Sequence, residues 1–133
     1  MDKKDKRELS VYRLNTAKQD LEYSKLLLTS GGFKVSINRS YYAVFHAMRA
    51  VLALEGFDSK KHSGIISKFR QLYVKTGIFD INMSDIIESL FKFRNDADYE
   101  DFFVISKDEA TEQLEYARKF CNEIETYLKT VWQ

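Results

Sequence analysis

The chain has 133 residues, of which 44% are apolar and 31% are charged, a balance typical of an ordinary globular protein rather than a disordered one. Its 21 lysines and arginines against 20 aspartates and glutamates leave a formal charge of +1. This near-neutrality excludes a global field that attracts nucleic acid non-specifically, so any such contact must come from a local patch. Residues 1–133 are expected to form a single domain, since a chain of this length can bury a helical core on its own.

The composition also bears on metals and on the cellular compartment. A single cysteine, Cys121, excludes an internal disulfide and a cysteine-rich metal site. His46 and His62 lack a metal-ligand spacing, and the acidic side chains of residues 96–101 are interpreted as a solvated helix end. We therefore expect no metal and no cofactor. No apolar run resembles a signal peptide or a membrane span, which favours a cytoplasmic protein without a membrane contact.

Apolar residues at three- and four-residue spacing predict the first three helices, at about residues 7–29, 35–55 and 62–76. A fourth helix is expected to start near Asn82, a good capping residue. The run Ser106-Lys107-Asp108-Glu109 forms a capping box, in which two side chains satisfy backbone N–H groups, and is the clearest helix start in the chain.

Glycines mark the helix ends, because the chain has five glycines and no proline. Gly31-Gly32, Gly56 and Gly77 each follow an apolar stretch, as expected of residues just beyond a helix C-terminus, whereas Gly64 is an exception. The connections are short, and short connections make consecutive helices pack antiparallel. The sequence therefore predicts an all-α, up-and-down antiparallel bundle of about five helices.

The most informative polar cluster begins at Arg94, one turn beyond the last apolar residues of the fourth helix. Helical periodicity places Arg94 at the edge of the buried stripe, where a charge needs a partner. Asp98 is within reach four residues later, and Asn95 and Tyr99 add hydrogen-bonding groups. One interpretation is a structural ion pair that closes the helix; the other is a functional site.

A second polar face runs along the predicted second helix and includes Tyr42 and His46. His46 is a candidate for proton transfer, although a histidine in a small bundle is more often a hydrogen-bonded packing residue. The best candidate basic patch for a phosphate, if the fold brings it near Arg94, consists of Arg39, Arg49, Lys60, Lys61 and His62, and Tyr42 is a further candidate for binding.

Three segments resemble a prokaryotic subfamily of HEPN proteins: residues 38–50 (NRSYYAVFHAMRA), 60–64 (KKHSG) and 94–99 (RNDADY). The resemblance extends from about Leu14 to Leu128. It implies a helical bundle that pairs as a homodimer, often encoded as a toxin beside a minimal nucleotidyltransferase that acts as its antitoxin. Many members of the wider family are metal-independent endoribonucleases that use an arginine, a polar residue and, four to six positions on, a histidine.

This chain departs from that ribonuclease motif. Arg94 and Asn95 match, but the positions from Tyr99 to Asp101, where the histidine would fall, contain none. Tyrosine and aspartate are poor substitutes for a histidine that moves a proton near neutral pH. Tyr99 is similar in position to a tyrosine that the partner nucleotidyltransferase modifies with AMP in some HEPN toxins; alternatively it caps the fourth helix with a packed ring.

Three functional hypotheses follow. The first is a homodimer that binds RNA or a nucleotide in a cleft containing Arg94, as the toxin-like or substrate-binding partner of a nucleotidyltransferase. The second is a protein-interaction module without catalysis, against which the retained Arg94-Asn95 pair counts. The third is an active ribonuclease that uses Arg94, Asn95 and Asp98, with His46 or His62 as the base.

Overall fold

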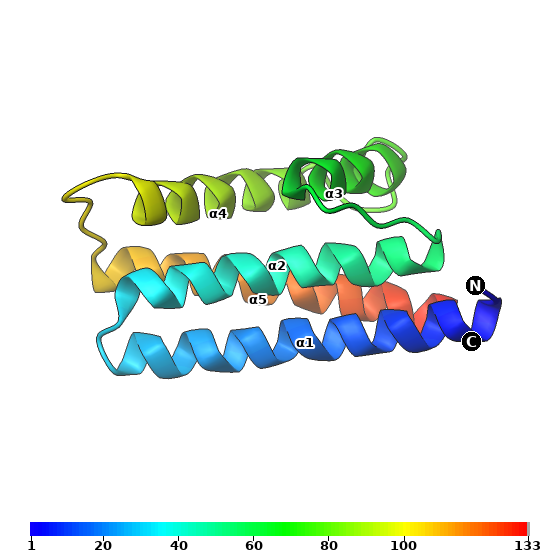
Figure 1. The fold of residues 1–133 in the computed structure, drawn as a ribbon, viewed down its shortest axis with the longest axis horizontal. Coiled ribbons are helices and arrows are strands. Elements are labelled where there is room, and N and C mark those ends of the chain that lie inside the picture. Colours follow the sequence, from blue (N-terminus) through cyan, green and yellow to red (C-terminus); the bar gives the residue numbers. More distant parts are fainter. Residues whose placement is uncertain (133) are drawn as a thin grey trace.

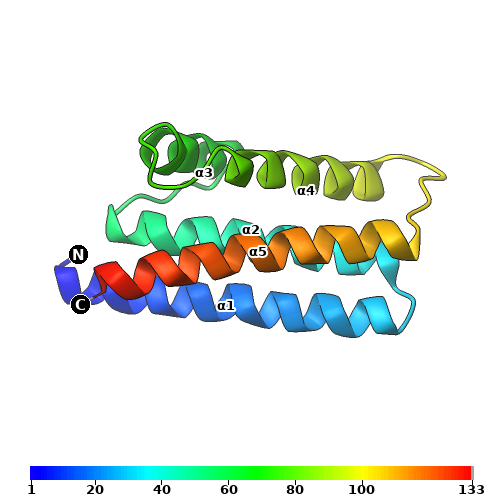
Figure 2. The same ribbon diagram turned by 180° about the vertical axis from the view of Figure 1, so that it is seen from behind.

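The computed structural model describes residues 1–132, which form a bundle of helices (Figure 1). The elements are α1 (Lys3–Thr29), α2 (Phe33–Leu54), α3 (His62–Phe69), the π-helical turn η1 (Arg70–Val74), α4 (Asn82–Tyr99) and α5 (Lys107–Val131). The predicted all-α bundle of about five helices is confirmed. Helix α2 contacts each of the other helices, with α1 on one side and α3 and α4 on the other (Figures 1 and 2).

The helix boundaries follow from local capping. Helix α1 begins four residues before the prediction because the Asp2 side chain accepts a hydrogen bond from the Asp5 N–H. The predicted capping box at Ser106 is present at the start of α5. Asn82 is the first residue of α4 and not its cap; Asp80 Oδ1 accepts a hydrogen bond from the Asn82 N–H at 2.9 Å instead. Within residues 1–132, no helix has the length and apolar character needed to cross a membrane.

The connection between α2 and α3, residues 55–61, folds back along α2. His62, at the start of α3, contacts Tyr41 in the first half of α2, whereas the Tyr73 hydroxyl donates a hydrogen bond to the Val51 carbonyl near the end of α2. Consequently α3 and η1 run in the same direction as α2, unlike the other consecutive helices (Figure 1). This reversal brings His62 beside the middle of the bundle.

Side chains of α1 and α2 fix this connection, together with a hydrogen bond inside it. The Asp58 carboxylate accepts hydrogen bonds from Arg13 of α1 and Arg49 of α2, each at 3.1 Å. Ser59 Oγ accepts a hydrogen bond from the Lys61 N–H at 3.2 Å, at the residue that precedes α3. The position of His62 thus depends on contacts made by its neighbours in sequence.

Ser59 leaves no room for a side chain at Gly64. A Cβ at this position would lie 2.6 Å from Ser59 Oγ and 3.1 Å from Ser59 Cβ. We expect Gly64→Ala to lower the free energy of unfolding by about 1 kcal/mol, since overpacking of about 1–3 kcal/mol exceeds the better helix propensity of alanine. Urea denaturation measures this loss, and adding Ser59→Ala should recover part of it. A single variant as stable as the wild type would contradict the expected clash.

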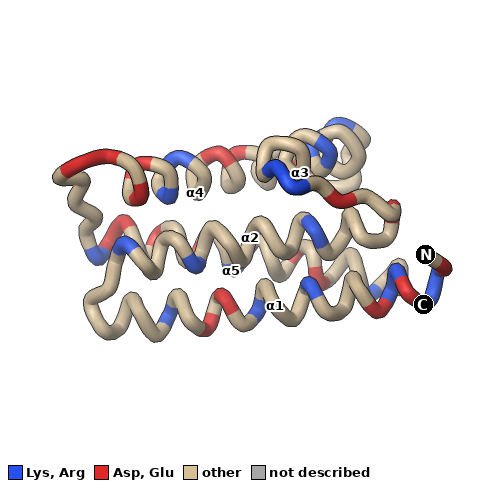
Figure 3. Tube along the Cα trace, in the orientation of Figure 1, with Lys and Arg blue, Asp and Glu red and all other residues tan. Residues whose placement is uncertain are grey.

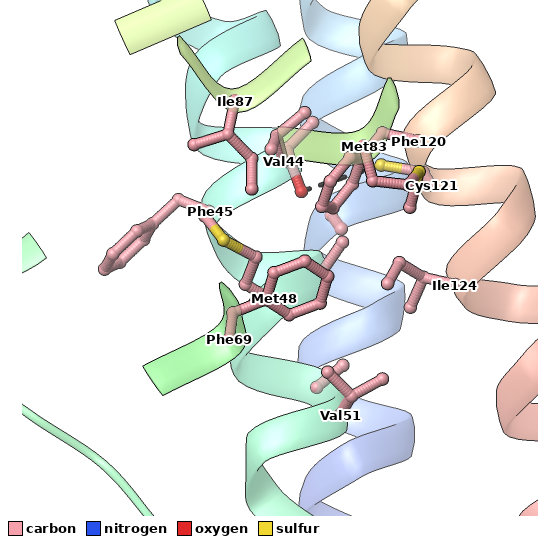
Figure 4. Packing of buried hydrophobic residues seen from close by; sticks show 14 of the residues in the cluster. Val44, Phe45, Met48, Val51, Phe69, Met83, Ile87, Phe120, Cys121 and Ile124 are labelled. Carbon is pink, nitrogen blue, oxygen red and sulfur yellow. Dashed lines mark hydrogen bonds between the residues drawn. The ribbon is translucent and has the colours of Figure 1, made fainter. Parts of the chain in front are cut away.

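The core lies between α2, α5 and the pair formed by α3 and α4 (Figure 4). The ring centre of Phe69 is 5.5 Å from that of Phe120 and 5.8 Å from that of Phe79, and the Phe69 side chain has no exposed surface. Cys121 is buried beside these rings, and its thiol donates a hydrogen bond to the Ala43 carbonyl. A core of this kind gives α2 a rigid position from which its polar face can present functional side chains.

Candidate functional site

Arg94 of α4 lies against two tyrosine rings of α2. Its guanidinium carbon is 5.2 Å from the ring centre of Tyr41 and 5.6 Å from that of Tyr42. Arg94 Nη2 donates a hydrogen bond to Tyr42 Oη at 3.4 Å, and only 15% of the Arg94 side chain is exposed. The guanidinium is thus oriented by cation–π contacts in a site largely shielded from water.

The predicted pair between Arg94 and Asp98 is present, with Arg94 Nε 3.0 Å from Asp98 Oδ2. The Nε–H does not point at the carboxylate, so Nε has no hydrogen-bond partner. Within residues 1–132, three buried side-chain atoms lack such a partner: this Nε, Nδ1 of His46 and Nε2 of Gln113. Two of the three belong to residues of the predicted site. The Arg94–Asp98 contact is therefore an ion pair without a hydrogen bond from Nε.

His62 reaches the same cluster from the first turn of α3. Its Nδ1 and Tyr41 Oη are 2.8 Å apart and share a hydrogen bond, and its ring stacks on Phe45 with ring centres 4.1 Å apart. Burial, together with the positive charges of Arg94 and Arg49, lowers the pKa of His62 below its ordinary value. Burial raises the pKa of Tyr41 to about 12. Near pH 7, therefore, a neutral imidazole lies beside a neutral phenol and a cationic guanidinium.

His46 lies on the other side of Tyr42, towards α1. Its Nε2 is 3.9 Å from Asp20 Oδ2, and Arg39 donates a hydrogen bond to the other oxygen of the same carboxylate. Burial and the charges of three arginines lower the pKa of His46 to about 4. Of the two histidines, His62 is the one placed next to Arg94.

The low pKa of His46 predicts a loss of stability in mild acid. The groups around His46 are Arg13 and Asp20 of α1, Arg39 and Arg49 of α2, and His62. The unfolded chain protonates this histidine near pH 6.5 and the folded chain only near pH 4. The unfolded state therefore binds more protons than the folded state between these pH values. The stability that the neutral His46 gives to the folded protein is lost as the pH falls from about 6.5 to about 4.

Urea denaturation at pH 7, 5.5 and 4.5 tests this expectation with His46→Gln as the comparison. The wild type should lose more stability than the variant over this range. Burial raises the pKa of Asp20, so Asp20 makes the folded protein more stable as the pH falls, in the wild type and in the variant alike. The difference in the free energy of unfolding between the two proteins therefore reports on His46. Identical pH profiles would contradict the expectation.

Two arginines predicted for a basic patch border the same rings. The guanidinium carbon of Arg39 is 4.9 Å from the ring centre of Tyr42, and that of Arg49 is 5.9 Å from the ring centre of Phe45. Each also pairs with one aspartate, at 3.1 Å. The structure thus brings Arg39, Arg49, His62 and Arg94 around one row of aromatic rings, although carboxylates balance much of the charge.

The remaining predicted residues surround this row at greater exposure. Lys60 and Lys61 are exposed just before α3, where the chain is coloured blue in Figure 3. Asn95 is exposed, and within residues 1–132 no hydrogen bond joins its side chain to the cluster. Tyr99 ends α4 with 71% of its surface exposed, which contradicts the packed ring considered from the sequence. The structure, over the same residues, contains no group of three or more potential metal ligands.

Comparison with known proteins identifies the family of the chain. The model of the HEPN domain family matches residues 10–127. The chain belongs to the HEPN domain family. A protein of Methanocaldococcus jannaschii named "Putative toxin MJ0142" is 31% identical over 96% of this chain and 86% of its own length. A "UPF0332 protein" of Thermotoga maritima is 27% identical over 94% of this chain and 95% of its own length.

Sequence reasoning missed two residues that shape the site of this HEPN domain. Tyr41 and Phe45 belong to the buried stripe of α2, yet they hold His62 through a hydrogen bond and a stacked ring. Two sequence signals include them: the segment 38–50 that carries the family resemblance, and the adjacent pair Tyr41-Tyr42, in which one ring faces the core and the next faces the polar side.

Proposed function

We propose that this HEPN domain is a toxin-like protein that binds RNA by holding a backbone phosphate at Arg94. The observation that carries the proposal is the oriented, largely shielded guanidinium of Arg94, with the neutral ring of His62 close by. Guanidinium groups have five N–H donors in a geometry that suits phosphate, and Arg94 uses one of them in a hydrogen bond to Tyr42. The exposed side chains of Lys60 and Lys61 add positive charge for the backbone of a single strand.

The toxin-like role is supported by the names of two relatives from Methanocaldococcus jannaschii. As its partner we propose a minimal nucleotidyltransferase, which the family resemblance implies, in a cytoplasmic pair. The exposed phenol of Tyr99 is a suitable acceptor for AMP. Its oxygen would attack the α-phosphorus of ATP, forming a P–O bond as pyrophosphate leaves and the phenolic proton passes to a base of the partner or to water.

Incubation with that nucleotidyltransferase and ATP tests the modification by intact mass. The wild type should gain one AMP and Tyr99→Phe should gain none. An unmodified wild type, or an adduct that persists in Tyr99→Phe, would contradict the assignment.

The position of His62 favours a second candidate function, metal-independent cleavage of RNA. A neutral His62 could take the proton of a ribose 2′-hydroxyl. The 2′-oxygen would then bond to phosphorus, the bond from phosphorus to the 5′-oxygen would break, and that oxygen would take a proton from water. Arg94 would stabilise the negative charge on the phosphate oxygens.

Incubation with single-stranded RNA in EDTA tests both candidates. The wild type should bind, with an affinity that falls as salt rises. No binding at low salt would contradict the proposed function. Cleavage that is lost in His62→Ala and kept in His46→Ala supports the second candidate, whereas binding without cleavage rejects it.

We also propose the homodimer that the family resemblance implies. Light scattering at micromolar concentration should give twice the mass of a single chain. A monomeric mass would contradict it.

A further inference from the structure

A groove with a volume of about 560 Å³ lies between α3–η1 and α4. Its walls include the apolar side chains of Ile66, Ile87 and Phe91, and its polar lining includes Ser63, Ser67 and Arg70. The volume falls within the range typical of small-ligand sites, which combine apolar walls with a few polar groups. None of the contacts described for the Arg94 cluster uses this space.

The groove adjoins the Arg94 cluster on both of its sides. On α4, Phe91 is one turn before Arg94, and its ring centre lies 6.1 Å from that of Tyr41. On α3, Ser63 directly follows His62. A ligand held at Arg94 and His62 would therefore lie at one end of the groove.

We propose that this groove binds the base of the nucleotide whose phosphate lies at Arg94. This inference rests on the proposed function and deepens it by naming a base subsite. Phe91, which is 40% exposed, offers a ring face for stacking, and the buried side chains of Ile66 and Ile87 lie beneath the groove. The hydroxyls of Ser63 and Ser67 can donate to or accept from the edge of a base.

The far end of the groove suits a neighbouring phosphate of the same strand. Arg70 is held there because its Nε donates to Ser84 Oγ at 2.8 Å, and Glu88 pairs with Arg70 Nη2 at 3.3 Å. The Arg70–Glu88 pair has no net charge, so Lys75, which also lines the groove, gives the lining one net positive charge. From His62 to Arg70 the helix rises about 12 Å, which leaves room for a nucleotide between the two ends.

The affinities of adenosine monophosphate and ribose 5-phosphate separate the contribution of the base from that of the phosphate, because both ligands have the phosphate and only the first has a base. We expect the wild type to bind adenosine monophosphate roughly tenfold more tightly, measured by NMR titration. Ser67→Trp should fill the groove and remove this advantage without weakening ribose 5-phosphate. Phe91→Leu, which removes the stacking ring but keeps an apolar side chain, should reduce the advantage independently. Glu115→Trp, at an exposed position of α5, is the bulky control and should bind like the wild type.

The outcomes distinguish the subsite from the function on which it rests. Equal affinity of the wild type for both ligands overturns the base subsite and leaves phosphate binding intact. The base subsite is also overturned if both Ser67→Trp and Phe91→Leu still bind adenosine monophosphate more tightly than ribose 5-phosphate by the same factor as the wild type. Failure of the wild type to bind either ligand or RNA overturns the proposed function itself. If Ser67→Trp instead converts a dimer into a monomer, the groove holds a second copy of the chain and the base subsite is wrong.

Discussion

RNA binding should weaken at least tenfold when Arg94 is replaced by alanine. A charge-assisted hydrogen bond contributes about 1.5–3 kcal/mol, and Arg94 is placed to make such bonds from a site with 15% side-chain exposure. Arg94→Lys should recover only part of the loss, because an ammonium keeps the charge but not the planar set of donors that lies over Tyr41 and Tyr42. Fluorescence anisotropy with a labelled single-stranded RNA measures the change.

Lys92→Ala is the matched control, since it removes one positive charge from an exposed position of the same helix. It should weaken binding only slightly. The slope of log affinity against log salt should fall by about one unit in Arg94→Ala if that residue contacts a phosphate. Equal losses in the two variants would show that Arg94 contributes only as one charge among many.

Replacement of Phe69 by alanine should cost about 3–5 kcal/mol of the free energy of unfolding, the largest effect on stability that we expect. Phe69 has no exposed surface, and its ring packs against Tyr73, Phe79 and Phe120. Its removal would leave a cavity where α3 meets the bundle. Urea denaturation at pH 7 measures the loss.

Phe102→Ala provides the comparison, because 99% of the Phe102 surface is exposed. The same chemical change at this position should alter stability by no more than about 0.5 kcal/mol. A loss below about 1 kcal/mol for Phe69→Ala would mean that α3 packs loosely on the core and would contradict a fixed position of His62 beside Tyr41.

The helices were predictable because their causes are local. The capping box at Ser106 involves residues three positions apart, and Arg94 meets Asp98 one helical turn away. The early start of α1 was missed since the charged residues before Arg7 lack an apolar stripe, and a cap at Asp2 suffices there. The spacing of apolar residues predicts a helix from the face that it buries, and it does not predict a helical turn whose side chains are exposed.

The geometry of the site depends on distant contacts, which explains why sequence reasoning could not choose between His46 and His62. Asp58 contacts Arg13, 45 positions earlier, and so directs residues 55–61 back along α2. Only this reversal brings His62 to Tyr41. Without it, the spacing of His46 from Tyr42 on one helix made His46 the candidate for proton transfer, yet the structure turns His46 towards Asp20.

An NMR titration of the labelled protein with a short single-stranded RNA tests the central claim most directly. Side-chain signals of Arg94 Nε and the His62 ring should shift together, with the same apparent affinity, while the half-buried His46 ring beside Asp20 shifts less. Shifts confined to exposed lysines, with Arg94 and His62 unchanged at saturating RNA, would contradict a phosphate site at this cluster.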